Sequence, residues 1–106
     1  MPRINTRDAA DYITALTPFS SNGAIRGDNL DGRNFIVWSY GTPIAVIDRD
    51  GERIDLNGER YSTTTSKHQH AARIAARRLE RDGYQVTEWD AVDFTDATGL
   101  HARRHR

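Results

Sequence analysis

The chain has 106 residues, 37% of them hydrophobic, and its 15 basic side chains balance 15 acidic ones. This length supports one domain with one core, and the neutral charge argues against both a non-specific polyanion binder and an acidic DNA mimic. The absence of cysteine excludes a disulfide scaffold and a thiolate metal site. No apolar run approaches the length of a membrane span and no signal peptide is visible, so we expect a soluble protein of the cytoplasm without a membrane partner.

Residues 6–16 predict a short amphipathic helix that ends before Pro18. Its apolar side chains recur at three- and four-residue spacing and share one face: Ala9, Tyr12, Ile13 and Leu16. Residues 19–33 are rich in Ser, Asn, Gly and Asp, which indicates a connection around a possible edge strand at residues 24–26.

Residues 34–40 and 44–48 are β-branched and aromatic, and Gly41-Thr42-Pro43 joins them. The dipeptides Asp50-Gly51 and Asn57-Gly58 tolerate positive φ angles, so both predict tight hairpin turns. The sequence therefore predicts a meander of three or four antiparallel strands between residues 34 and 62.

Residues 64–82 change to helical spacing, and Gly83 ends the expected helix. Residues 84–89 are expected to return as a strand. We predict an α+β fold in which a small antiparallel sheet of three to five strands packs against this long helix and a short N-terminal helix. Residues 1–100 form the single domain, and residues 101–106 are expected to be a basic, disordered tail.

The segments 39–45 (SYGTPIA) and 61–69 (YSTTTSKHQ) form a motif pair. This pair resembles a family of small proteins from bacteriophage and plasmid genomes, described only as a domain of unknown function. The similarity spans roughly residues 19–76. It implies a mobile-element origin and an accessory role, and it assigns no activity, substrate or catalytic residue.

The helix start is the first candidate site. Free backbone N–H groups, consecutive hydroxyls and nearby cations could hold a phosphate of a nucleic acid or nucleotide. Helix capping alone also explains one hydroxyl there. The candidate side chains are Thr64, Thr65, Ser66, Lys67 and His70.

A row of basic side chains continues from that start along one helical face: His70, Arg73, Arg77 and Arg81. Such a stripe could follow a phosphate backbone, although Glu80 dilutes it and an ordinary solvated face has the same pattern.

Alternation places Ile36, Trp38 and Tyr40 on one side of their strand. If helices cover a single face of the sheet, Trp38 and Tyr40 could form a platform for base stacking or a protein hot spot. If both faces are covered, these rings belong to the core.

His68 lies on the apolar face of the helix, where a buried histidine bonded to a hydroxyl such as that of Tyr61 or Ser62 is the usual arrangement. No nucleophile motif, carboxylate pair or set of metal-ligand spacings stands out. We therefore expect no enzymatic activity, no cofactor and no metal.

Two functions fit these features. The first is a non-catalytic accessory protein that contacts nucleic acid through the helix start and its arginine stripe. The second is a phage-encoded ligand that inhibits or redirects a host protein. The acidic residues 88–96 and the aromatic residues Trp38, Tyr40 and Trp89 suit such an interface. A homodimer is left open.

Overall fold

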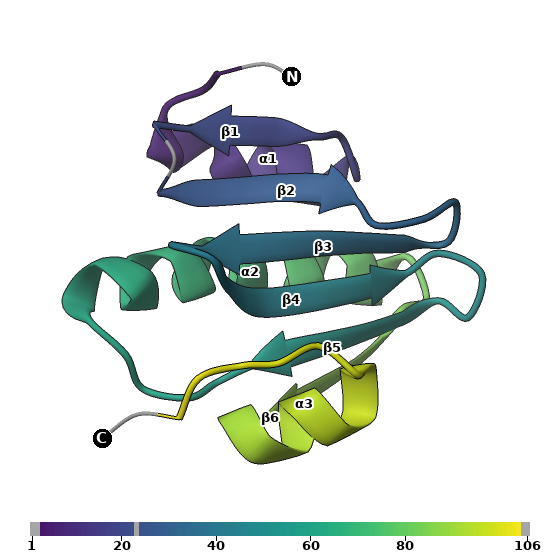
Figure 1. Cartoon of the computed structure of the whole chain (residues 1–106). Coiled ribbons are helices and arrows are strands. Elements are labelled where there is room, and N and C mark those ends of the chain that lie inside the picture. The colour runs from purple at the N-terminus through teal and green to yellow at the C-terminus, as the bar shows by residue number, and fades with distance from the viewer. Residues whose placement is uncertain (1–2, 23, 105–106) are drawn as a thin grey trace.

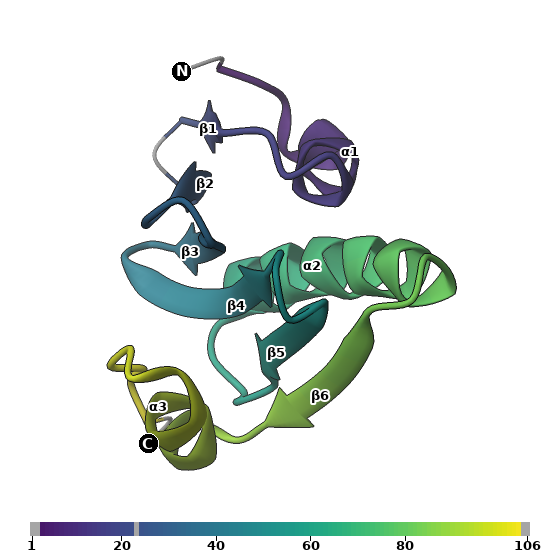
Figure 2. The ribbon, with the colours of Figure 1, turned by 90° about the vertical axis from the view of Figure 1, so that its right-hand side faces the viewer.

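The fold is an open mixed sheet with helices on both faces, seen in a computed structural model that describes residues 3–22 and 24–104 (Figures 1 and 2). The described residues form a six-stranded sheet whose strands lie side by side in sequence order. The elements are the 3-10 helix η1 (Thr6–Asp8), α1 (Ala9–Thr14), β1 (Phe19–Ser21), β2 (Ile25–Asn29), β3 (Asn34–Ser39), β4 (Thr42–Asp48), β5 (Arg53–Asn57), α2 (Thr63–Arg81), β6 (Gln85–Trp89) and α3 (Ala91–Thr98).

The α+β class and the central meander are confirmed, since β3, β4 and β5 pair antiparallel in succession. The turn between β3 and β4 is tighter than predicted. It consists of Tyr40 and Gly41, both with positive φ (49° and 83°), so Thr42 and Pro43 belong to β4. Two consecutive left-handed residues suit the right-handed twist of a two-residue hairpin.

The N-terminal half of the sheet is larger than expected. The predicted connection at residues 19–33 contains two strands, β1 and β2, which pair with each other and extend the meander through β3. The sheet therefore has one strand more than the largest number predicted.

The predicted hairpin at Asn57-Gly58 was wrong. The Asn57 side chain is buried and donates to the Pro43 carbonyl oxygen at 3.1 Å, and the chain continues into α2. The helix then returns the chain so that β6 pairs parallel with β5. A parallel return requires a long crossover, which α2 supplies, and the sheet is mixed rather than antiparallel.

The core has two separate parts. Helices α1 and α2 cover one face (Figure 2). Buried side chains from the strands and both helices form the main core there, with Phe19, Phe35, Ile54 and Leu79 among them. The other face is covered near β5 and β6 by α3, a helix that the sequence analysis missed. Its smaller cluster consists of Ile36, Val46, Ala91, Phe94 and Ala102.

None of the helices in the described ranges is long and apolar enough to span a membrane.

Candidate functional site

The N-terminus of α2 is held by a side-chain cap. Ser62 is extended (φ −77°, ψ 166°), and its Oγ accepts the Thr65 N–H at 3.2 Å. The Ser62 carbonyl oxygen accepts the Ser66 N–H at 2.9 Å. In residues 3–22 and 24–104, no hydrogen bond involves the amides of Thr63 and Thr64. These two N–H groups are thus directed away from the helix and contribute to its partial positive charge.

The hydroxyls at the helix start divide into two groups. Thr64 and Ser66 are exposed, whereas Thr65 is buried. The Thr65 hydroxyl oxygen accepts from Ser62 Oγ at 3.2 Å and from Ser39 Oγ at 3.1 Å. The Thr65 side chain therefore joins α2 to the end of β3 and serves the fold.

His68 completes this buried network. Its ring is 2% exposed, and its Nδ1 lies 2.7 Å from Ser39 Oγ. Because Ser39 gives its single proton to Thr65, the Nδ1–H of His68 donates to Ser39. Burial lowers the pKa of His68, so the neutral ring is favoured. The predicted buried, hydroxyl-bonded histidine is confirmed, with Ser39 as the partner in place of Tyr61 or Ser62.

A hollow of about 500 Å³ opens beside this helix start. We call it the α2 hollow. It is lined by Ser39, Tyr40, Thr42, Tyr61, Ser62, Thr65, Arg103 and Arg104.

The two arginines reach the α2 hollow because residues after α3 pack back onto the domain. Ala102 is 4% exposed, and its N–H donates to Thr95 Oγ1 at 3.0 Å. The Tyr61 hydroxyl donates to the Arg103 carbonyl oxygen. Residues 101–104 of the segment predicted as a disordered tail are therefore in contact with the domain, and residues 105–106 lie outside the described residues. Sequence reasoning missed both arginines at this site.

Tyr40 contributes an aromatic ring to the same hollow. The side chain is 57% exposed, and its ring centroid lies 5.7 Å from that of His68 on the α2 side. Trp38 lies on the opposite side of the sheet, where the Arg26 guanidinium is 4.2 Å from the centre of its ring. The left-handed turn at Tyr40 reverses the expected alternation, so the two aromatics do not form one platform.

The arginine stripe is partly neutralised. Arg73 Nε lies 2.8 Å from Glu88 on β6, and Arg77 lies 3.2 Å from Glu80. Lys67, His70 and Arg81 are exposed along the same helix. Surface ion pairs of this kind contribute little to stability, but they reduce the positive charge that a polyanion would meet.

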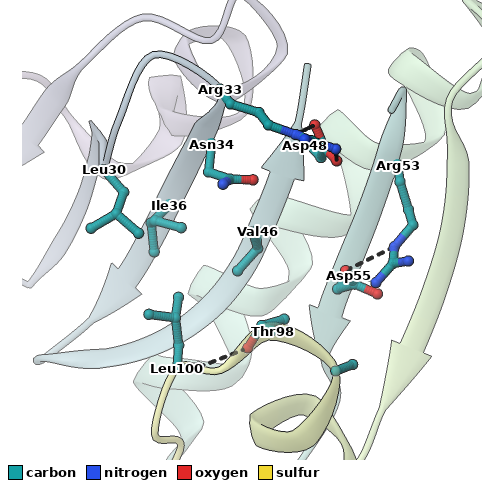
Figure 3. Close-up of a pocket in the computed structure, with 11 residues that line it drawn as sticks. Leu30, Arg33, Asn34, Ile36, Val46, Asp48, Arg53, Asp55, Thr98 and Leu100 are labelled. Carbon is teal, nitrogen blue, oxygen red and sulfur yellow. Dashed lines mark hydrogen bonds and ion pairs between the residues drawn. The ribbon is translucent and has the colours of Figure 1, made fainter. Parts of the chain in front are cut away.

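A second hollow, of about 290 Å³, lies on the other face of the sheet, between β3–β5 and the end of α3 (Figure 3). Its floor includes Ile36, Val46 and Leu100. Its charged groups are already paired, Arg33 before β3 with Asp48 of β4, and Arg53 with Asp55 two residues along the same strand. Arg33 makes two 2.8 Å bonds to Asp48, and Arg53 lies 3.1 Å from Asp55 (Figure 3).

The Asp48 carboxylate in this second hollow also accepts the amides of Asp50 and Gly51. The hydrogen-bonded Arg33 guanidinium, together with these backbone bonds, holds the pKa of Asp48 well below its usual value. The Asp48 carboxylate is thus already bonded to groups of the protein itself. The second hollow therefore has fewer free charged groups for binding a ligand than the α2 hollow has. Within the described ranges, no group of three or more His, Asp or Glu side chains is arranged to hold a metal ion.

Comparison with known proteins gives one match. A family of unknown function, DUF8033, matches residues 7–88, which include both halves of the motif pair and most of the sheet. No curated protein and no solved structure matches the chain. Because the match covers more than half of the sequence, the chain belongs to the DUF8033 family of unknown function.

Proposed function

We propose that this protein is a non-catalytic accessory protein of a bacteriophage or plasmid, acting in the host cytoplasm, that binds nucleic acid at the α2 hollow. The observation that carries the proposal is the meeting of three features in one place. These are the start of α2, whose Ser62 and Thr65 line the hollow, the residues Arg103 and Arg104, and the exposed ring of Tyr40. The amides of Thr63 and Thr64, which make no hydrogen bond in the described residues, directly follow Ser62 in the chain.

A backbone phosphate is suited to the helix end of this hollow. Two outward N–H groups and the helix dipole favour an anion, and guanidinium groups add charge and paired donors. Binding of a phosphate there would leave the helix cap intact, because the cap is the hydrogen bond from the Thr65 N–H to Ser62 Oγ. The phosphate would use only groups that the fold leaves free.

A base is suited to the Tyr40 side of the hollow. The ring is exposed on one side and rests near His68 on the other. Stacking on such a ring contributes about 1–3 kcal/mol per base and tolerates any base. The arrangement therefore favours single-stranded nucleic acid over a duplex, whose bases are already stacked.

The proposal is tested by fluorescence anisotropy with labelled single-stranded DNA, single-stranded RNA and duplex DNA at low salt. The double variant Arg103→Ala/Arg104→Ala should weaken binding at least tenfold and lower the salt slope on single strands by about 1.4, because each phosphate contact of a single strand contributes about 0.7. Tyr40→Ala should weaken single-strand binding and leave duplex binding unchanged.

The matched control is Arg77→Ala/Arg81→Ala, which removes the same charge from the arginine stripe. We expect little change, since Arg77 already pairs with Glu80. A larger loss in this control than in the Arg103/Arg104 variant would transfer the binding surface to the stripe. No binding of any of the three probes by the intact protein would refute the proposal.

A second candidate function is a ligand for a host protein, favoured by the uncovered part of the α3 face. Figure 1 shows β1 to β3 without a helix in front of them. Trp38 and Arg26 stack there, and Leu30 is 55% exposed. Aromatic and arginine side chains are the usual anchors of protein interfaces.

Affinity capture from host lysate, with and without nuclease treatment, distinguishes the two functions. Capture of one protein that resists high salt and is lost with Trp38→Ala supports the second function. Capture that disappears after nuclease treatment supports nucleic acid.

A further inference from the structure

The two edges of the sheet differ in how their backbone groups are used. At the first edge, Arg3 forms a bridge to Ser20 of β1, and the Ile4 N–H donates to the Ser20 carbonyl oxygen at 2.8 Å. At the second edge, β6 pairs with β5 on one side, and no strand in the described residues lies on its other side.

The hydrogen bonds to β5 fix which groups of β6 face outward. The Gln85 N–H donates to the Glu52 carbonyl oxygen, and the Trp89 carbonyl oxygen accepts from Gly58, each at 2.8 Å. Both backbone groups of one strand residue point to the same side, and the side alternates along the strand. The N–H and C=O groups of Val86 and Glu88 therefore point away from the sheet.

The one charged side chain of β6, Glu88, is already paired with Arg73. Residues 85–89 contain no proline or lysine, and their register with β5 has no bulge. Natural sheets use such features to prevent pairing between molecules. Val86, Thr87 and Trp89 are instead residues that favour strands.

We propose that β6 pairs antiparallel with β6 of a second copy of this chain, about a two-fold axis that passes beside Thr87. In this register Val86 lies opposite Glu88 of the other copy. The two residues of each such pair exchange both backbone hydrogen bonds. All outward groups of Val86 and Glu88 are then satisfied by an identical strand, so the spacing is self-complementary.

The side chains fit the same register. Val86 and Glu88 lie on the α2 side, beside a groove of about 130 Å³ that Leu56, Ala76 and Arg77 also line. Glu88 is paired with Arg73 of its own copy at 2.8 Å, and two-fold pairing places it opposite Val86 of the other copy, at the groove that Arg77 lines. On the α3 side, Thr87 lies opposite Thr87, a favourable cross-strand pair. Because the strand is short, we expect a concentration-dependent dimer.

Light scattering after size exclusion, over a wide concentration range, measures this equilibrium. Val86→Pro removes an outward N–H without removing a bond to β5, and should weaken the dimer at least tenfold. Val86→Thr keeps the N–H and the β-branched shape, and should dimerise like the parent. Circular dichroism establishes that both variants are folded. A protein that stays monomeric at every concentration, or a folded Val86→Pro variant that dimerises like the parent, would overturn the proposal.

Single cysteines test the register, because the chain has no cysteine of its own. In Thr87→Cys the two Cα atoms lie about 4.5 Å apart, within the range of a disulfide, so mild oxidation should link the copies. In Gln85→Cys the same atoms lie roughly 13 Å apart, since four residues at about 3.3 Å separate them, and no link should form. Equal linking of the two variants would contradict the register. Neither test uses nucleic acid, so its outcome is independent of the proposed function.

Discussion

The two faces of the sheet are built in different ways. On the α1/α2 face, a long helix and a short one cover a continuous core with Phe35 and Ile54 at its centre. On the α3 face, the eight-residue helix α3 packs through Phe94 over the part of the sheet near β5 and β6. The part of the same face over β1 to β3 has no helix on it. The first face therefore holds most of the core, whereas the second leaves the stacked side chains of Arg26 and Trp38 and the exposed Leu30 available for contacts with other molecules.

The largest expected effect comes from truncating the central ring of either core. Phe35→Ala and Phe94→Ala should each cost about 3–5 kcal/mol of unfolding free energy, measured by urea denaturation. Only Phe94→Ala should also change the tryptophan fluorescence of the folded protein, because Trp38 and Trp89 pack against the Phe94 cluster.

The milder variants Phe35→Leu and Phe94→Leu show whether the two cores are independent. Their effects should add within about 0.5 kcal/mol, because the side chains share no cluster. Strong non-additivity would show that the two faces behave as a single core.

A second prediction concerns how tightly the α1/α2 face is packed. A Cβ atom at Gly27 would lie 2.8 Å from Phe35 Cζ and closer still to the Phe19 ring, both rings being fully buried. Gly27→Ala should therefore cost about 1–3 kcal/mol through overpacking. Gly32 has no neighbour within 4 Å of such an atom, so Gly32→Ala is the matched control. Equal stabilities of the two variants in urea would show that the rings can shift freely.

A third prediction compares the helix caps on the two faces. Ser62 caps α2 and Asp90 caps α3, each by accepting a backbone N–H three residues later. Ser62→Ala and Asp90→Ala should each cost about 1 kcal/mol in thermal or urea unfolding. Thr63→Ala, one residue after the α2 cap, should change stability by less than about 0.5 kcal/mol. A loss at Thr63 as large as that at Ser62 would remove the capping explanation.

The smallest expected effect is a pH dependence at the contact between α2 and β3. Burial lowers the pKa of His68 in the folded protein, so the unfolded chain binds its proton more readily. The stability from His68 is complete above the ordinary pKa of about 6.5 and is lost as the pH falls through and below that value. Unfolding midpoints between pH 5 and 8 should show this slope. The slope should flatten in His68→Gln and persist in His70→Gln, whose side chain is exposed. A slope unchanged in His68→Gln would assign it to other groups.

The sequence predicted the α1/α2 face well because its patterns are strong. Helical spacing and Gly83 located α2 within one residue at each end, and β-branched runs located β3 to β5. It predicted only a possible edge strand at residues 24–26 where β2 extends to Asn29, because Gly27, which the neighbouring rings require, interrupts the pattern of a strand. It missed α3 because a short helix with few buried side chains gives little periodic signal.

The candidate site was predicted in part. The helix start, Thr65 and Tyr40 do meet there, since they lie in the motif pair that the sequence displays. Arg103 and Arg104 could not be placed, because their position depends on the packing of Ala102 beneath α3. Asn57-Gly58 was misread because local turn preference was overridden by the bonds that the Asn57 side chain donates to the Pro43 carbonyl oxygen and the Tyr61 hydroxyl.

The parallel pairing of β5 with β6 also has a consequence for the order of folding. The chain between these strands must close a loop that contains all of α2, whereas each earlier strand pair closes through a short connection. The final strand and α3 are therefore expected to join last, and to exchange their amide protons first under native conditions. The β6 edge, which assembles last, is therefore the part of the fold that pairing with a second molecule would stabilise most.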